Sequence, residues 1–234
     1  MSEKRIVVAI DGPAGAGKST LARRVAEKLG FVYINSGSMY RAIALWALRL
    51  GVELNDMHRL EQLAKEAKIE LQPGTHPRVL LNSEDVTEAL REPGVSAAAS
   101  KVSAVPGVRR ALLSAQRRIA EDHSVVMEGR DIGSVVFPAA QVKIFLDADP
   151  QERARRRTLE LQQRGHRADL HSVAGDLHER DQRDRKRSEA PLVQAPDAQL
   201  IDTTGRSLED LEEIILKLVR SRTSNGKEAA RSTA

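Results

Sequence analysis

The stretch Gly12-Pro13-Ala14-Gly15-Ala16-Gly17-Lys18-Ser19 fits the pattern G-x-x-x-x-G-K-[ST] and decides the fold. An apolar run at residues 6–10 comes directly before it and predicts a buried strand, and residues 18–29 follow with the pattern of a helix. A strand, a glycine-rich turn and a helix N-terminus build a phosphate cradle, because backbone N–H groups close around the anion and the helix start adds partial positive charge. The sequence therefore predicts a site for a nucleoside triphosphate.

Two side chains of this stretch have expected roles in that site. Lys18 is placed to reach the β- and γ-phosphates, and Ser19 is placed to offer its hydroxyl to Mg²⁺. A glycine-rich turn that matches by accident is the alternative, but the strand before it and the helix after it favour the phosphate site. We assign the metal position to Ser19 and the donor nucleotide to Gly12, Pro13, Ala14, Gly15, Ala16, Gly17, Lys18, Ser19 and Thr20.

The composition is that of a soluble globular protein, with 234 residues of which 41% are hydrophobic and 30% are charged. There is no cysteine, which excludes disulfides and thiolate metal sites. The apolar runs are too short for a signal-peptide core or a membrane span, so we expect a cytoplasmic protein. A net charge of +4 suits nucleic acid or small phosphate compounds, but an aromatic content of 3% disfavours a base-stacking surface.

Apolar runs alternate with helical patterns along the chain and predict an α/β fold with a five-stranded parallel sheet, the fifth strand being the weakest. Short strands and a Pro73-Gly74 turn indicate a small inserted lobe at about residues 55–104. We expect one domain over residues 1–220, with its core at about 4–54 and 105–220, and a disordered tail at 221–234. Expected strands are 6–10, 31–34, 125–127, 142–146 and 199–201; expected helices are 18–29, 38–50, 57–68, 108–121, 150–164, 174–187 and 207–220.

Polar motifs follow the expected strands, at the edge where ligands of open parallel sheets bind. Arg130 beside Asp131 suits a phosphate clamp next to a carboxylate that faces a base or a metal, and an ion pair that fixes the loop is the alternative. Arg41 lies one helical turn beyond another strand end and could point over the same cleft, and a helix arginine in solvent is the alternative. No spacing of histidine and glutamate suggests a zinc site, so Mg²⁺ arriving with the nucleotide is the expected metal.

Two arginine-rich helices add further candidates. Arg180, Asp184 and Arg187 fall at i, i+4 and i+7, which is one face of a helix and suits a hydroxylated sugar together with a phosphate. A solvated helix with internal ion pairs is the alternative. The other helix begins with arginines that could stabilise a transferring phosphoryl group. They cannot all face one cleft, so at least one is expected in solvent: Arg153, Arg155, Arg156 and Arg157.

Five motifs follow one another along the chain: residues 11–20, Asn35-Ser36-Gly37-Ser38-Met39-Tyr40-Arg41, Glu128-Gly129-Arg130-Asp131-Ile132-Gly133, residues 142–148, and residues 179–187 with Ala190-Pro191-Leu192. In these motifs the sequence closely resembles bacterial cytidylate kinases, within the nucleoside monophosphate kinase family. The match runs from residue 6 to about 219 and departs little from the pattern, with Asn35 where many relatives have Asp. The resemblance implies a P-loop three-layer fold, an inserted CMP-binding lobe and a short lid at about residues 150–188.

The resemblance also implies MgATP as donor and CMP or dCMP as acceptor. The implied acceptor residues are Ser36 at the site, Arg41, Arg130 and Arg187 at the phosphate, Ser100, Arg109 and Asp131 at the cytosine edge, and Arg180 and Asp184 at the pentose. The implied catalytic residues are Lys18, Arg130, Arg157 and Arg187, although which lid arginine contacts the transferring group is left open. We expect a monomer that needs no membrane or nucleic-acid partner.

Two other functions remain as alternatives. A kinase for another small acceptor, such as a non-nucleotide acid, would not depend on Arg109 or Asp131. A nucleic-acid-binding module that uses ATP as a switch would bind RNA or DNA with a steep salt dependence and would not turn over free CMP. The acidic residues interleaved in 180–187 disfavour a stripe that follows a phosphate backbone.

Overall fold

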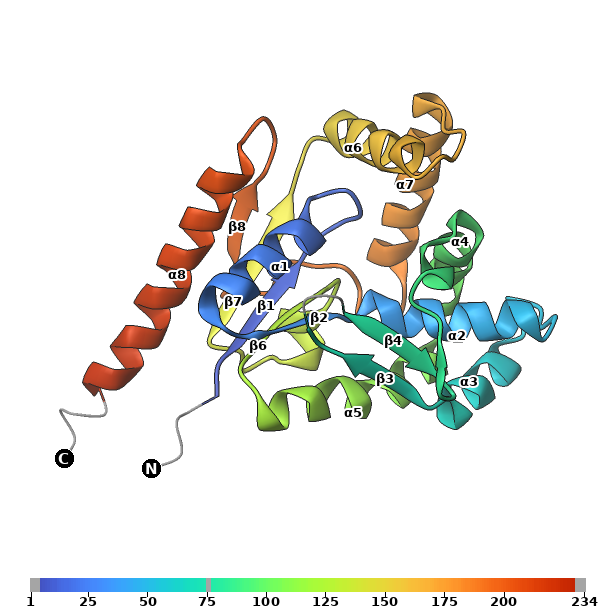
Figure 1. The fold of residues 1–234 in the computed structure, drawn as a ribbon, viewed down its shortest axis with the longest axis horizontal. Helices are drawn as coiled ribbons and strands as arrows, with labels where there is room; N and C mark the ends of the chain where they lie inside the picture. Colours follow the sequence, from blue (N-terminus) through green and yellow to red (C-terminus); the bar gives the residue numbers. More distant parts are fainter. Residues whose placement is uncertain (1–4, 75–76, 230–234) are drawn as a thin grey trace.

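The computed structural model describes residues 5–74 and 77–229, and a five-stranded parallel sheet lies at its centre (Figure 1). The strand order is β2-β6-β1-β7-β8, so β1, the strand before the phosphate loop, is the middle strand. Both neighbours of β1 are parallel to it, with Ala9 opposite Met127 on one side and Lys143 on the other. The predicted parallel α/β fold is confirmed, in the strands β1 (Val7–Asp11), β2 (Val32–Asn35), β6 (Val125–Gly129), β7 (Val142–Asp147) and β8 (Gln199–Asp202).

Helices cover both faces of this sheet, because successive side chains of each strand point to opposite faces. Val8 and Ile10 of β1 pack in one apolar cluster with α1 (Lys18–Leu29) and α8 (Leu208–Ala229). Ala9, between them, belongs to a second cluster with residues of α5 (Pro106–Asp122) and of a single π-helical turn, η2 (Ile132–Val136). The result is three layers with the polar strand ends left open at one edge.

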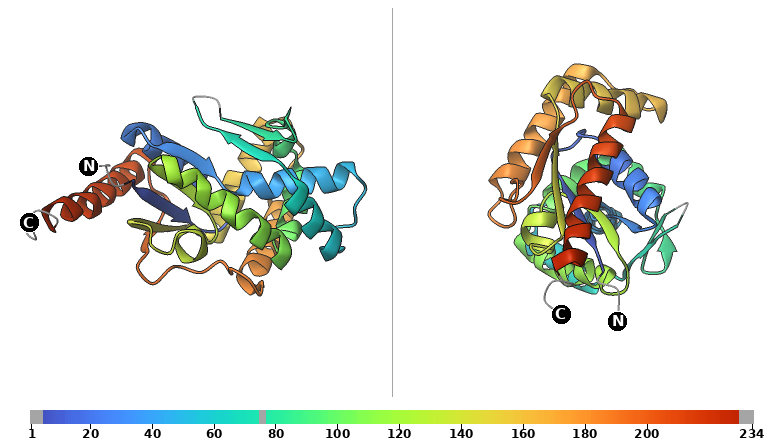
Figure 2. Two further views of the ribbon diagram at one scale, coloured as in Figure 1. Left: turned by 90° about the horizontal axis from the view of Figure 1, so that it is seen from below. Right: turned by 90° about the vertical axis from the view of Figure 1, so that its left-hand side faces the viewer.

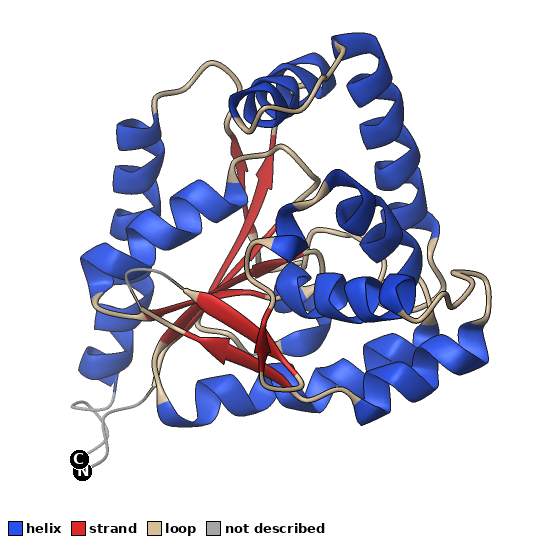
Figure 3. Cartoon of the chain, turned by 45° about the vertical axis from the view of Figure 1, so that its right-hand side comes forward, coloured by secondary structure: helices blue, strands red, loops and turns tan. Residues whose placement is uncertain are grey.

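A second sheet has its own strand pairing, separate from that of the first, and Figure 3 shows the strands of both among the helices. It is antiparallel, in the order β3-β4-β5, as the short strands and turns of this segment predicted. Its apolar side chains, among them Val79 and Leu81, pack on Ala42 and Leu45 of α2. The elements of this region are α2 (Gly37–Arg49), α3 (Met57–Glu66), β3 (Ile69–Gln72), β4 (Arg78–Leu81), β5 (Glu84–Asp85), η1 (Ala89–Arg91) and α4 (Pro93–Val102).

Helix α4 was not among the expected helices. Its first residues, Pro93 and Gly94, have the composition of a turn, and its small residues give little contrast between an apolar and a polar face. Pro93 nevertheless occupies the first turn, where its fixed φ suits a helix and its missing N–H costs nothing. Packing of Ala98, Ala99 and Val102 against α2 and α5 then supplies the stability that the local pattern does not show.

Helices α6 (Pro150–Gln163) and α7 (Leu170–Lys186) form a pair at the end of the sheet that carries the phosphate loop (Figures 1 and 2). Asp149 caps α6 by accepting hydrogen bonds from the backbone of Gln151 and Glu152. Asp169 caps α7, which therefore begins four residues earlier than expected. Val173 and Leu177 of α7 pack with Ala154 of α6, and Ala14 of the phosphate loop joins this cluster.

The predicted disordered tail is wrong for residues 221–229, because α8 continues to Ala229. Once a helix is formed, each added residue gains a backbone hydrogen bond, and no proline follows that would stop it. Arg222 also donates a hydrogen bond to the carbonyl of Asp197, which holds the helix against the chain before β8. Residues 230–234 of that tail, and residues 1–4 of the expected domain, lie outside the described residues. No helix in the described part of the chain is long and apolar enough to cross a membrane.

Candidate active site

The phosphate loop, residues 12–19, has a backbone that only glycine adopts readily. Gly12 has φ of 145°, and a Cβ there would lie 2.0 Å from the carbonyl oxygen of Leu146. Gly17 has φ of 85° and directly precedes the first residue of α1. Positive φ values of this kind strain any residue with a side chain. The glycines recognised in the sequence are therefore required by the shape of the loop.

We expect Gly12→Ala to destabilise the fold by about 3 kcal/mol or more, because backbone strain and a clash with β7 add together. Thermal unfolding with and without ATP would measure this. Gly30→Ala is the matched control, since Gly30 also has positive φ but a Cβ there would meet no atom within 4 Å. Equal losses in the two variants would show that the close approach to Leu146 is unimportant.

Lys18 is the first residue of α1 and lies inside the loop. Its side chain is only 6% exposed, and its ammonium donates a hydrogen bond of 2.6 Å to the carbonyl of Pro13. Burial, together with repulsion from Arg130, lowers the pKa of Lys18 to about 7. The ammonium is thus a poorly solvated cation that an anion in the loop would stabilise.

Asp11, the last residue of β1, joins the phosphate loop to the loop after β6. Its carboxylate accepts hydrogen bonds from the backbone of Ile132 at 2.8 Å and of Gly133 at 2.7 Å. Burial raises the pKa of Asp11 to about 6, although the two backbone donors oppose this. The sequence analysis did not assign Asp11, because its partners lie more than a hundred residues away in the chain.

The phosphate loop opens into a cavity of about 370 Å³, a volume typical of small-molecule sites. Most of the residues assigned from the sequence line it together, although they come from distant segments. Gly12, Pro13, Ala16, Gly17, Thr20 and Ser100 do not line it. Those that do are Ala14, Gly15, Lys18, Ser19, Ser36, Arg41, Arg109, Arg130, Asp131, Arg157, Arg180, Asp184 and Arg187.

One wall of the cavity holds a buried carboxylate between two arginines. Asp131 makes an ion pair with Arg109 of α5, and its other oxygen lies 3.6 Å from a guanidinium nitrogen of Arg187. The guanidinium of Arg109 also lies 5.2 Å from the centre of the Tyr40 ring. All three charged side chains are buried, so a polar ligand edge there would meet fixed and desolvated donors and acceptors.

The arginine stripe of α7 faces the same cavity. Arg130 donates a hydrogen bond of 2.9 Å to Asp184, and Arg187 lies 3.9 Å from the other oxygen of Asp184. Burial opposes ionisation, but Arg130, Arg180 and Arg187 together hold the pKa of Asp184 below its usual value. The Nε atom of Arg180 is buried and has no hydrogen-bond partner within the described residues. This crowding of cations favours an anionic ligand.

The cavity is also lined by residues that the sequence analysis included in an expected strand or a motif but did not assign: Tyr33, Asn35 and Glu128. The carboxylate of Glu128, at the end of β6, accepts hydrogen bonds from Tyr33 at 2.6 Å and from Asn35 at 2.9 Å. Ser36 donates to the backbone carbonyl of Glu128 at 2.8 Å. Burial lowers the pKa of Arg41 on the neighbouring helix. A carboxylate at the end of a strand beside the phosphate loop is the signal that could have indicated Glu128.

The four arginines at the start of α6 have different surroundings. Arg157 lines the cavity and donates a hydrogen bond of 2.8 Å to Glu160. Arg155 is exposed and forms an ion pair with Glu152 on its own helix, as expected for at least one of the four. Arg153 and Arg156 instead contact the phosphate loop and the segment after β8. Of the four, Arg157 is the one that borders the cavity.

Comparison with known proteins decides the family. The model of the cytidylate kinase family matches residues 8–221. The chain belongs to the cytidylate kinase family. A cytidylate kinase of Solibacter usitatus (strain Ellin6076) is 58% identical over 228 residues, which cover 97% of each chain. A cytidylate kinase of Symbiobacterium thermophilum is 49% identical over 219 residues, covering 93% of this chain and 97% of that relative.

The family function is phosphoryl transfer to CMP, so the chain is a nucleotide-binding kinase, and the resemblance identified in the sequence is confirmed. A solved structure of an uncharacterized protein from Eubacterium ventriosum ATCC 27560 matches with a TM-score of 0.53. It is 13% identical and covers 93% of this chain and 99% of its own, and at that identity it shows the fold alone.

Proposed function

We propose that this cytidylate kinase transfers the γ-phosphoryl group of MgATP to CMP or dCMP and releases ADP with CDP or dCDP. The observation that carries the proposal is the joining of two sites in one cavity. A phosphate loop with a buried lysine lines this cavity, and so does the Arg109–Asp131–Arg187 cluster. The first suits a triphosphate, and the second suits a base with both donors and acceptors on its edge.

The cations that line the cavity suit the two phosphates that must meet. Arg41, Arg130 and Arg187 are available to the acceptor phosphate, and Lys18 and Arg157 to the transferring group. Bringing two polyanions together needs fixed positive charge and exclusion of water more than it needs a nucleophilic side chain. The acceptor phosphate is itself an oxyanion, so no strong general base is required.

Cytosine presents an N3 acceptor beside an N4 amino donor, which a paired arginine and carboxylate complement. We assign the base edge to Arg109 and Asp131, and the pentose to Arg180 and Asp184. We also assign Ser36, which lines the cavity, to the acceptor. Ser100 does not line the cavity, and its hydroxyl accepts a hydrogen bond from Arg183. Unpaired polar groups left by a wrong base in this buried site would cost several kcal/mol.

Mg²⁺ fits this site as a partner of the nucleotide. Ser19, in the first turn of α1, lines the cavity beside Lys18 and offers a hydroxyl oxygen, the kind of donor that Mg²⁺ prefers. In residues 5–74 and 77–229 no cluster of three acidic or histidine side chains provides a complete site. Mg²⁺ would therefore be held by Ser19, water and the donor phosphates, where it would neutralise charge on the phosphates.

A panel of monophosphates tests the proposal. We expect Mg²⁺-dependent ADP release with CMP and dCMP at least a hundredfold faster, as kcat/KM, than with AMP, GMP or UMP. A coupled assay that measures ADP would record this, with nucleotide-free buffer as the background. Equal rates with all five acceptors would contradict the specificity. The monomeric state and the cytoplasmic location stay predictions.

A further inference from the structure

The peptide groups of the phosphate loop are held from outside the cavity. The carbonyl of Ala14 accepts a hydrogen bond of 3.2 Å from Arg153, and the carbonyl of Ala16 accepts one of 3.3 Å from Thr203. In a trans peptide the N–H of the next residue points opposite to the carbonyl. Fixing these two carbonyls therefore fixes the direction of the N–H groups of Gly15 and Gly17. Within the described residues no backbone hydrogen bond occupies either N–H.

Arg153 makes this contact as part of a wider set. Its guanidinium also donates to the carbonyl of Ala148 at 3.1 Å and to the carboxylate of Asp181 on α7 at 2.6 Å. The side chain is 7% exposed, so these bonds are screened from water. The backbone of Arg153 also lies against the phosphate loop, because a Cβ on Gly15 would lie 2.9 Å from the carbonyl oxygen of Arg153. One buried residue thus joins the phosphate loop, the start of α6 and α7.

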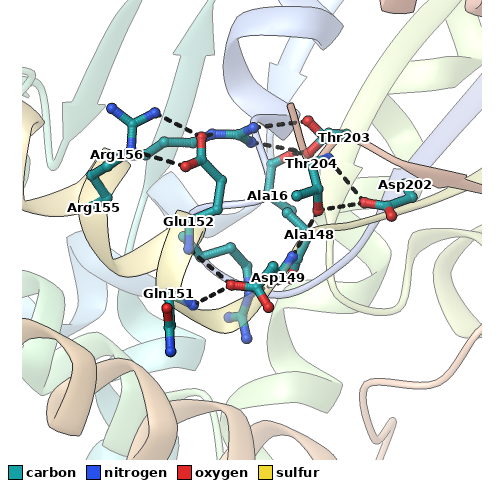
Figure 4. Close-up of polar contacts among 11 residues, drawn as sticks. Ala16, Ala148, Asp149, Gln151, Glu152, Arg155, Arg156, Asp202, Thr203 and Thr204 are labelled. Carbon is teal, nitrogen blue, oxygen red and sulfur yellow. Dashed lines mark hydrogen bonds and ion pairs between the residues drawn. The ribbon is translucent and has the colours of Figure 1, made fainter. Parts of the chain in front are cut away.

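Thr203, directly after β8, is a second and independent anchor (Figure 4). Its hydroxyl accepts a hydrogen bond of 3.0 Å from Arg156, which leaves its own proton free to donate to Ala16. Arg156 also binds the backbone carbonyl of Thr203 at 2.8 Å, and Glu152 holds Arg156 in turn. The loop is therefore anchored at the carbonyls of Ala14 and Ala16 by side chains that α6 positions.

We propose that Arg153 is a positioning residue of the kinase, which orients the N–H groups of the phosphate loop through the carbonyl of Ala14, with Thr203 performing the same task at Ala16. Preorganised backbone donors bind phosphate better than donors that must be ordered on binding. The orientation of these N–H groups should strengthen ATP binding whether or not the acceptor nucleotide is present.

A second consequence rests on the proposed function. Asp181 lies next to Arg180 and one turn before Asp184, so the Arg153–Asp181 pair sets the position of the α7 stripe relative to the loop. Arg153 thereby connects the phosphate loop, which is proposed to bind the donor, with the α7 residues that are proposed to bind the acceptor. Its loss should lower kcat more than it raises KM for CMP, because alignment of the two phosphates matters most in the transition state.

The test uses the full chain and the variants Arg153→Lys and Thr203→Val. Lysine keeps the charge and the apolar stem, but a single ammonium cannot reach Ala14, Ala148 and Asp181 together. We expect the Kd for ATP, measured by calorimetry without acceptor, to rise at least tenfold in Arg153→Lys and about fivefold in Thr203→Val. We also expect kcat with CMP to fall at least tenfold in Arg153→Lys while KM for CMP changes less than threefold.

Two controls separate positioning from general stability. Arg155→Ala removes the neighbouring exposed arginine and should keep wild-type ATP affinity. Val219→Ala opens the core between α8 and the sheet and should lower the melting temperature with little change in the Kd for ATP. Wild-type ATP affinity in both test variants would overturn the proposal. It would also be overturned if Val219→Ala lost as much ATP affinity as a test variant with the same melting temperature. If Arg153→Lys does not fold, the ATP affinity of Thr203→Val decides alone.

The same measurements keep this inference apart from the proposed function. ATP binding is measured in the absence of any acceptor, so it reports on the anchors alone. A wild-type protein that binds ATP but does not phosphorylate CMP would contradict the proposed function, but it would not contradict the positioning role of Arg153 and Thr203. Wild-type ATP affinity in both anchor variants, with CMP still phosphorylated, would contradict the inference alone.

Discussion

Lys18→Met is expected to lower kcat with CMP by about 10³-fold while the protein remains folded. Lys18 is a buried cation of the phosphate loop that lines the cavity, and charge that develops on a transferring phosphoryl group is stabilised most by a cation that water does not screen. Methionine fills the same volume without the charge. Single-turnover measurements with saturating ATP and CMP would separate this effect on the chemical step from any effect on binding.

The stability of the same variant is a check on the interpretation. The unfolded chain keeps the proton of Lys18 up to its usual pKa of 10.5, whereas the folded chain releases it near 7. The unfolded state therefore binds more protons between these values, and the stability of the wild type rises with pH in this window. Without nucleotide, Lys18→Met should be at least as stable as the wild type at pH 7, and any advantage should shrink toward pH 10.

Melting curves at pH 7 and pH 10 would measure this, with Arg155→Ala as a control whose stability relative to wild type should not change with pH. Near-normal kcat in Lys18→Met would remove the basis for assigning the phosphate loop to the donor. A variant that fails to fold at both pH values would show instead that the contact between Lys18 and Pro13 is structural.

The sheet and the phosphate loop were predictable because both depend on local patterns. The run before Gly12, the glycines and the helix after Lys18 are contiguous, and the physical requirements of a phosphate cradle act on consecutive residues. The stripe of Arg180, Asp184 and Arg187 was predictable for the same reason, since a helix places residues of that spacing on one face. The strands, the phosphate loop and this helix face could therefore be predicted from the spacing of residues that are close together in the sequence.

The partners of those residues could not be derived from the sequence. Arg109 meets Asp131, Arg130 meets Asp184 and Arg153 meets Ala14 only when segments that are far apart in the chain fold together. The sequence contains several basic residues that could pair with each acidic residue, and the sequence pattern does not show which of them does. Asp11 and Glu128 were missed for this reason: each is an ordinary polar residue at a strand end until its distant neighbours are known.

Asp131→Asn is expected to lower kcat/KM for CMP by about a hundredfold and to reduce the preference for CMP over UMP at least tenfold. The carboxylate can only accept hydrogen bonds, so it favours the N4 amino group of cytosine over the O4 carbonyl of uracil. The amide of asparagine can turn either its oxygen or its nitrogen toward the base and so accepts both. Initial rates with CMP and UMP at fixed ATP would give the ratio.

Removing this charge also leaves Arg109 and Arg187 buried without their common partner, which should cost about 3 kcal/mol of stability. A loss of stability alone would lower the rates with both acceptors and leave their ratio unchanged. Asp184→Asn is therefore the matched control: it also removes a buried carboxylate among arginines, but one assigned to the pentose, so its CMP to UMP ratio should stay at the wild-type value. An unchanged ratio in Asp131→Asn would show that this carboxylate holds its two arginines in place and does not read the base.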